Sequence, residues 1–364
     1  MEYQLHIQDP DQSSTRYLFE SMVEAAESAN SWHGIFAFAS KNGIENLFRD
    51  PSFGKFLSTG TASLIVGIDA VTNRAALETL QQFEAEFAGL TARVFWNKTS
   101  KLFHPKLSLF ESAAGSRELI VGSGNLTPGG LRLNHEAYSV VRSDVRKDID
   151  ITSLESFFEH IKDAIRPIDE EVLSRAAKNV FRGRRTGRGT AAEQATPEPD
   201  VDTPDGTEPI AVPTTARLLI ARVPAAAGRW AQIHLNRDVV EQFFRIKPNS
   251  AERAFLNERR MDGTFGPEEV RPCIYAVANK NFKIEMAAAK GHEYPSAGPP
   301  LALYLELGLR TFEYMLLFPS HPLYGAVDQL LVSLPPLGRG LHRSVTTLEA
   351  LGAIWPDCPF LQEN

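Results

Sequence analysis

A break in composition between residues 182 and 212 divides this chain of 364 residues into two parts. From Arg182 the sequence reads RGRRTGRGTAAEQATPEPDVDTPDGTEP, an arginine-rich start followed by proline and acidic residues, with hardly any large apolar side chain. Such a segment buries too little apolar surface to offset the conformational entropy that ordering it would cost. We therefore expect a flexible linker over 183–212, between one domain at 1–182 and a second at 213–364, both of ordinary domain size.

The part before the linker alternates short β-type runs with helical patterns. Seven runs are predicted to be strands: YQLHI, GIFAFAS, SLIVGID, ARVFW, KLSLF, ELIVGS and AYSVV. The spacing of apolar residues predicts helices over 15–30, 73–87 and 151–180. This order of elements is typical of a layered α/β domain with a mixed sheet.

The part after the linker is dominated by strand patterns. Short apolar runs separated by Gly, Pro and Asn are predicted to be strands: TARLLIARV, AQIHL, CIYAVA, FKIEMAA, LALYLEL, TFEYMLLF and QLLVSL. NRDVVEQFFRI is the one clear helical pattern, and Asn236 is placed to cap its N-terminus. We expect a β-rich, barrel-like domain.

Charge, cysteine content and hydropathy exclude several classes of protein. The net charge of -7 argues against a protein that coats nucleic acid indiscriminately, although it permits a local basic groove. Cys273 and Cys358 lie outside any CxxC or CxxH pattern, so neither a disulfide framework nor a zinc site is indicated. The apolar runs are far shorter than the roughly 20 residues that span a bilayer. The N-terminus lacks the features of a secretory signal, and we expect a cytoplasmic protein without a membrane partner.

Residues 103–130, FHPKLSLFESAAGSRELIVGSGNLTPGG, carry the residue types best suited to chemistry. Because side chains alternate along a strand, His104 and Lys106 are expected side by side on one face. Pro105 between them favours the edge of a sheet or a bulge, where the loss of one backbone donor is tolerated. The pattern therefore predicts an imidazole held next to an ammonium group.

A glycine-flanked turn, GSGN, follows the next predicted strand. Asn125 is expected at a helix start, where unpaired backbone N–H groups attract an anion. The Ser123 hydroxyl and the Asn125 amide would then converge with His104 and Lys106 where a phosphate binds. Taken singly, each feature has a simpler explanation, because most HxK pairs are surface accidents and most such turns are only turns.

Together and at this spacing, the residues resemble the signature of the phospholipase D superfamily: HxK, four residues, an acid, then a short spacer and GSxN. The match comprises His104, Lys106, Glu111 and the turn at 122–125, within a resemblance that covers roughly 1–180. The usual acid of the superfamily is aspartate, so Glu111 is a departure, and we expect it to be structural rather than catalytic. Glu136 lies eleven residues past Asn125, where nucleases of the superfamily carry a glutamate that orients the histidine.

This resemblance implies a mechanism without metal or other cofactor. His104 would attack phosphorus and form a phosphohistidine, which divides one displacement into two. Glu136 would fix the imidazole tautomer by accepting a hydrogen bond from the other ring nitrogen. Lys106, Ser123 and Asn125 would bind the nonbridging oxygens and stabilise the charge of the transition state.

Only one HxK in the chain is followed by GSxN, whereas the mechanism needs a second histidine to protonate the leaving group. The resemblance therefore implies a two-fold homodimer, with His104 of each subunit at one shared site. Single-motif members include small bacterial nucleases and a metal-independent restriction endonuclease whose nuclease half precedes a DNA-binding barrel.

This chain has the same order of parts, so we expect a metal-independent DNA endonuclease of a restriction or phage-defence system. RNA as substrate and other defence-system proteins as partners remain open. Two alternatives remain, a phospholipid phosphodiesterase of the same superfamily and a catalytically idle module that binds nucleic acid. Basic side chains of the second half are candidates for contacts to phosphate: Arg229, Arg237, Arg245, Lys247, Arg259 and Arg260.

Overall fold

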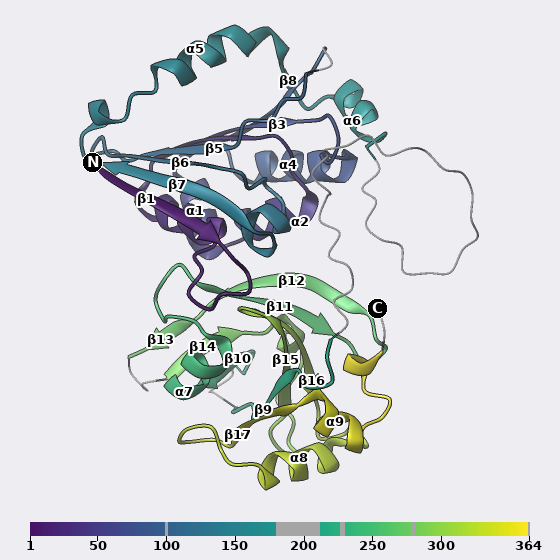
Figure 1. Cartoon of the computed structure of the whole chain (residues 1–364). Helices are drawn as coiled ribbons and strands as arrows, with labels where there is room; N and C mark the ends of the chain where they lie inside the picture. The colour runs from purple at the N-terminus through teal and green to yellow at the C-terminus, as the bar shows by residue number, and fades with distance from the viewer. Residues whose placement is uncertain (99–100, 180–211, 226–229, 278–280, 363–364) are drawn as a thin grey trace. The chain divides into compact units, whose positions relative to one another are not determined.

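The computed structural model describes residues 1–98, 101–179, 212–225, 230–277 and 281–362 (Figure 1). They form two compact units, one from most of the chain before residue 180 and one from residue 212 onward. The predicted linker at 183–212 lies outside the described residues except for its last position. In the described part of the chain, no helix combines the length and the apolar character needed to cross a membrane.

The first unit is built on a mixed eight-stranded sheet with the order β1-β7-β6-β5-β2-β3-β4-β8. β2, β3 and β4 are parallel neighbours, and the other neighbouring strands are antiparallel. This arrangement confirms the predicted layered α/β fold with a mixed sheet. The strands are β1 (Glu2–Gln8), β2 (Ser31–Phe36), β3 (Thr61–Gly67), β4 (Leu90–Phe95), β5 (Leu107–Glu111), β6 (Arg117–Gly122), β7 (Glu136–Ser143) and β8 (Ile165–Pro167).

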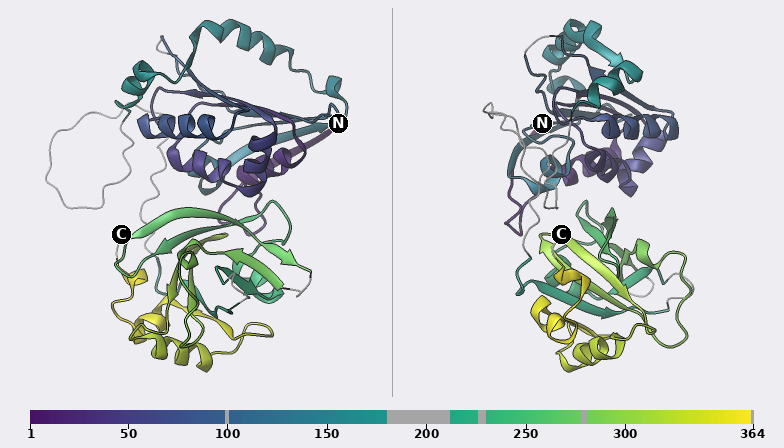
Figure 2. Two further views of the ribbon diagram at one scale, coloured as in Figure 1. Left: turned by 180° about the vertical axis from the view of Figure 1, so that it is seen from behind. Right: turned by 90° about the vertical axis from the view of Figure 1, so that its right-hand side faces the viewer.

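Helices pack on both faces of this sheet (Figures 1 and 2). One face carries α1 (Leu18–Ser28), α2 (Lys41–Phe48), α3 (Pro51–Thr59) and α4 (Arg74–Glu86). There Trp32 of β2 makes edge contacts with Phe48 and Phe53 and stacks on Phe110 of β5. The opposite face carries α5 (Thr152–Ile161), whose Phe157 and Phe158 pack against apolar residues of the central strands.

Two details of the first unit differ from the sequence pattern. The helix predicted over 151–180 is interrupted after α5 by β8 and resumes as α6 (Glu170–Ala176), since Pro167 disfavours helical backbone at and before its position. The helices α2 and α3 were not predicted, although their caps are visible in the sequence. Ser40 accepts from Gly43 N, and Asp50, just before Pro51, caps α3.

The second unit is β-rich, as predicted, but its two sheets do not close into a barrel among the described residues. The larger sheet has the order β12-β11-β16-β15-β9-β17 and the smaller one β10-β14-β13, so each keeps two edges. The strands are β9 (Arg217–Arg222), β10 (Gln232–Leu235), β11 (Arg253–Arg259), β12 (Phe265–Pro272), β13 (Ile274–Ala276), β14 (Asn281–Glu285), β15 (Leu301–Gly308), β16 (Thr311–Leu317) and β17 (Arg343–Thr347).

The larger sheet has an apolar core on each face. One core joins it to the smaller sheet and to α7 (Arg237–Val239) with the π-helical turn after it, through residues such as Phe243 and Phe282. Asn236 caps α7, as predicted, by accepting from Val239 N. The other core holds α8 (Tyr324–Ser333) and α9 (Leu348–Ile354). The run QLLVSL is thus part of a helix, and the strand prediction was wrong because periodicity cannot distinguish helix from strand in so short an apolar run.

Candidate active site

His104 and Lys106 lie side by side at the amino end of β5. The Lys106 Nζ is 3.1 Å from His104 Nδ1 and 3.0 Å from His104 Nε2. The predicted strand KLSLF starts at Lys106 and the ladder starts at Leu107, so His104 and Pro105, which lacks an N–H, lie just before the paired residues. The His104 ring is exposed and packs edge-on against Phe38 with centroids 6.0 Å apart, while Lys106 is only 8% exposed. The fold therefore fixes the cation and leaves the imidazole accessible.

The turn at 122–125 continues the pairing of β6 with β7. Ser123 N donates to Ala137 O at 3.0 Å, and Ala137 N donates to Ser123 Oγ at 3.1 Å. A Cβ built on Gly122 would lie 2.4 Å from the Tyr138 Cβ, so only glycine permits this close approach of β6 to β7. Close packing of the two strands therefore explains why the first position of the motif is a glycine.

Asn125 has a contact that the sequence pattern did not indicate. Its Oδ1 accepts from the backbone N of Phe38, at the end of β2, at 3.1 Å, and the residue is 9% exposed. The predicted helix start at Asn125 is wrong, because the short π-helical turn is capped at Pro128 and covers Gly129–Leu133. With Oδ1 held by a backbone donor, the side chain presents its NH2 group to its other surroundings. Asn125 is therefore a positioned hydrogen-bond donor.

Glu136 is the first residue of β7 and is half-buried. Its carboxylate accepts a hydrogen bond from Ser123 Oγ. A serine hydroxyl has one hydrogen to donate, so in this structure Ser123 orients Glu136. This contact differs from the phosphate-binding role predicted for Ser123. The predicted hydrogen bond from His104 to Glu136 stays a prediction.

Strand register explains why these residues meet. Leu107 pairs with Val121 of β6, and Gly122 pairs with Tyr138 of β7. Continued past the last pairs, the same register brings position 104, the turn at 122–125 and position 136 to one end of the sheet, on strands about 5 Å apart. An imidazole, an ammonium group, a fixed amide donor and a hydroxyl–carboxylate pair gather there. Such a set can bind an anionic oxygen and present a nucleophile to the atom that carries it.

Glu111 lies at the other end of β5. It accepts from Arg117 Nε at 2.7 Å and lies 3.3 Å from Arg146, and these are the contacts of a structural ion pair. The chain contains a second HxK, His160 to Lys162, at the end of α5. There Lys162 is exposed and pairs with a glutamate three residues earlier at 2.9 Å. This second HxK provides a natural control for experiments on the first.

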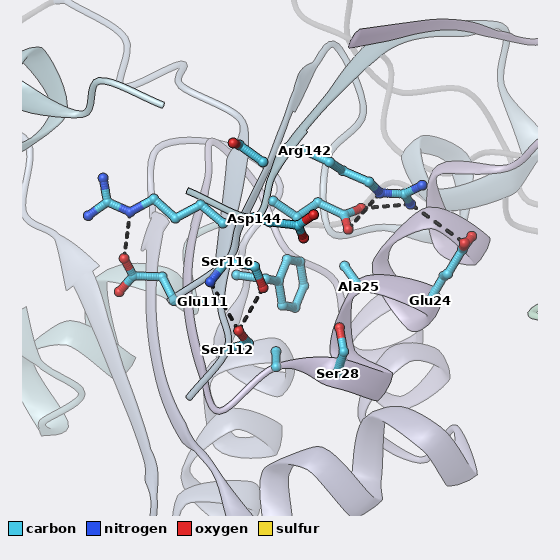
Figure 3. A pocket seen from close by; sticks show the side chains of 13 residues that line it. Glu24, Ala25, Ser28, Glu111, Ser112, Ser116, Arg142 and Asp144 are labelled. Carbon is cyan, nitrogen blue, oxygen red and sulfur yellow. Dashed lines mark hydrogen bonds and ion pairs between the residues drawn. The ribbon is translucent and has the colours of Figure 1, made fainter. Parts of the chain in front are cut away.

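A cavity of about 290 Å³ lies at the same end of the sheet as Glu111, away from His104 (Figure 3). Arg142 is fixed by Glu118, with Nε 2.8 Å from the carboxylate, and lies 3.7 Å from Glu24. Ser112 and Ser116 share a hydrogen bond of 2.6 Å. The lining contains neither histidine nor cysteine, and its three glutamates lie beside arginines. We therefore place the candidate active site at His104.

No protein-family model matches the sequence, and no curated protein matches it. Among solved structures, NucT from Helicobacter pylori is similar, with 12% identity over 46% of this chain and 99% of that chain and a TM-score of 0.33. Nuc from Salmonella typhimurium, described as a phospholipase D family member, has 20% identity over 45% of this chain and 94% of its own, with a TM-score of 0.30. The N-terminal domain of Helicobacter pylori LlaJI.R1 has 6% identity over 36% of this chain and 97% of its own, with a TM-score of 0.27. At these values the function has to be inferred from the site itself.

Proposed function

We propose that this protein is a metal-independent endonuclease of the phospholipase D type that hydrolyses DNA within a restriction or phage-defence system. The observation that carries the proposal is the contact between Lys106 Nζ and the His104 ring, with the fixed amide of Asn125 on the neighbouring turn. These groups match the needs of phosphodiester hydrolysis, namely a nucleophile and cationic or N–H donors for the nonbridging oxygens.

In the proposed reaction, a ring nitrogen of His104 attacks phosphorus, a P–N bond forms and the bond from phosphorus to the leaving oxygen breaks. The leaving alkoxide takes a proton from a second histidine. A water molecule then attacks the phosphohistidine, gives its proton to that second histidine and releases His104 with the phosphate-terminated product. Lys106 and Asn125 stabilise the charge on the phosphoryl oxygens in both steps, and Glu136, held by Ser123, keeps the imidazole oriented.

The second histidine is proposed to be His104 of another copy of this chain. A surface on the first unit suits such a copy. Tyr3, Leu5 and Ile7 of β1 are 63%, 61% and 61% exposed, and Val121 of β6 is 44% exposed. Register places Leu5 and Val121 on the same sheet face, because both pair with Ser139 of β7. α5 covers this face over the central strands and leaves it open over β1 and β6. Burial of this patch would stabilise a homodimer.

The second unit is proposed to bind DNA. Of the six basic residues that the sequence suggests for contacts to phosphate, the structure leaves only some with accessible side chains. Arg259 is 4% exposed and donates to backbone carbonyls, and Arg245 pairs with Glu306, so both are structural. Arg229 lies outside the described residues. Three of the expected basic side chains are exposed: Arg237, Lys247 and Arg260.

The test uses the purified full chain with plasmid DNA, DNA and RNA oligonucleotides and phosphatidylcholine in parallel, in excess EDTA. We expect DNA cleavage that persists in the chelator. The variant His104→Ala should lose at least about a thousandfold in rate, since both steps use this imidazole, whereas His160→Ala should keep full activity. Activity that vanishes in EDTA and returns with magnesium would contradict the mechanism. Cleavage of the phospholipid but not of DNA or RNA would favour a lipid phosphodiesterase. Binding of DNA without cleavage would favour an idle binding module.

A further inference from the structure

The second unit contains a pocket of about 470 Å³, and of its lining residues only Arg260 has been given a role in DNA binding above. It lies between the turn that joins β11 to β12, the end of β16 and the segments near residues 288–292 and 318–322. Its volume is within the range of about 300–1,000 Å³ that is typical of small-molecule and cofactor sites.

Aromatic and imidazole rings form one wall of this pocket. The Phe318 ring lies 5.2 Å from the ring of His292, centroid to centroid, and 6.1 Å edge-on from Trp230, which holds it in place. His292 is exposed. Met261, in the β11–β12 turn, also lines the pocket and is an apolar side chain with 42% of its surface accessible. The lining therefore offers a flat, apolar ligand rings to stack on and a flexible apolar side chain to contact.

Polar groups also line the pocket. His321 Nδ1 accepts from Leu323 N at 3.2 Å, so the neutral ring carries its hydrogen on Nε2 as a donor. Arg260 is 46% exposed, donates to Phe265 O at 3.0 Å and lies 3.8 Å from Glu258. It keeps guanidinium N–H groups beyond those that the backbone oxygen takes, and these are suited to a phosphate.

From this arrangement we infer that the pocket binds a nucleotide, with the base against Phe318 and His292 and the phosphate at Arg260. The inference deepens the proposed function, since it gives the second unit a nucleotide unit as its ligand. The same chemistry fits a free mononucleotide and a single nucleotide turned out of a DNA strand, because both offer a stacking face and a phosphate.

The experiment uses the full chain carrying His104→Ala, so that DNA is not consumed. Titration calorimetry with dAMP, dGMP, dCMP and dTMP should give a Kd of about 1 mM or tighter for at least one of them. Phe318→Ala and His292→Ala should each weaken that Kd by about fivefold or more, which is the loss of about 1 kcal/mol or more expected for one stacked base. His292 is exposed, so its variant tests the inference even where Phe318→Ala unfolds the unit.

Arg260→Ala should weaken binding of the monophosphate and leave binding of the corresponding nucleoside unchanged. Arg339→Ala, at an exposed arginine in the loop before β17 and outside the pocket lining, should change neither. Competition by a short single-stranded DNA would identify the strand as the source of the nucleotide, and its absence would identify a free mononucleotide. Two results overturn the inference. The first is that none of the four nucleotides binds at a concentration of about 10 mM, roughly ten times the expected Kd. The second is that both ring variants keep the affinity of the parent chain. Either result leaves the nuclease proposal standing, because EDTA-resistant cleavage by the wild-type chain is measured separately.

Discussion

Replacing Asn125 separates the two interactions that its amide combines. In Asn125→Asp, a carboxylate oxygen still accepts from Phe38 N, which lies 3.1 Å from Oδ1 in the wild type, but the donor for the phosphoryl oxygen becomes a negative charge. We expect kcat/KM to fall at least about 100- to 1,000-fold, or about 2.7–4 kcal/mol, as for the loss of one transition-state donor. The free energy of unfolding should stay close to that of the wild type.

In Asn125→Ala both interactions are lost. The Phe38 N–H is left without its side-chain acceptor, which costs about 1–3 kcal/mol of stability, and catalysis falls by about 2–4 kcal/mol. Plasmid nicking in EDTA measures the loss of catalysis, and urea unfolding measures the loss of stability. Asn134→Asp, at an exposed residue just after the π-helical turn, is the matched control. Full activity in Asn125→Asp would refute the donor role. Equal destabilisation in both variants would refute the assignment of Oδ1 to the Phe38 amide.

Three further perturbations test other parts of the molecule. Glu111→Ala removes the carboxylate that lies 2.7 Å from Arg117, an arginine only 8% exposed. The free energy of unfolding in a urea titration should therefore fall by about 1–3 kcal/mol, while the cleavage rate per folded molecule stays the same. A large loss of rate at unchanged stability would instead show that this acid is catalytic. Leu5→Glu places a charge on the exposed face of β1 and should convert the proposed dimer to an inactive monomer in sedimentation experiments. An active, dimeric variant would show that the interface is not at β1. Burial lowers the pKa of His33 below its ordinary 6.5, and the charge of Glu111 opposes this shift, so the folded state binds the proton more weakly than the unfolded one. Its contribution to stability is therefore complete above pH 6.5 and is lost as the pH falls below that value; His33→Gln should flatten urea midpoints between about pH 5 and 7, and an unchanged slope would contradict the assignment.

Local chemistry made one half of the candidate site predictable. The contact between His104 and Lys106 follows from side-chain alternation over two residues. It is present in the structure although both residues precede the first paired residue, Leu107. The partner of Asn125 does not follow from local sequence. Phe38 is 87 residues away, and the two meet because the chain after β6 pairs with the end of β2, where Ala39 and Leu126 form a bridge. Such non-local pairing depends on the whole sheet order.

The same limit explains the outcome in the second unit. Strand runs such as those of β15 and β16 are recognisable one at a time, whereas closure of a barrel depends on which edges meet, and alternation along a strand contains no information about that. The edges β12 and β17 remain unpaired with each other. A sheet with two apolar faces needs cover on both, and α8 and α9 supply it on the side away from the smaller sheet.

Ser123 shows how the structure changes a role within an otherwise coherent site. The sequence motif assigns its hydroxyl to phosphate, but in the structure the hydroxyl donates to Glu136 and its oxygen accepts from Ala137 N. Because a hydroxyl has a single hydrogen, it cannot serve the carboxylate and a phosphoryl oxygen at once. We therefore propose that Lys106 and Asn125 bind the anion and that Ser123 acts by holding the carboxylate that is proposed to orient His104. In this proposal the serine of the motif is a positioning residue, and its influence on the reaction should pass through the imidazole.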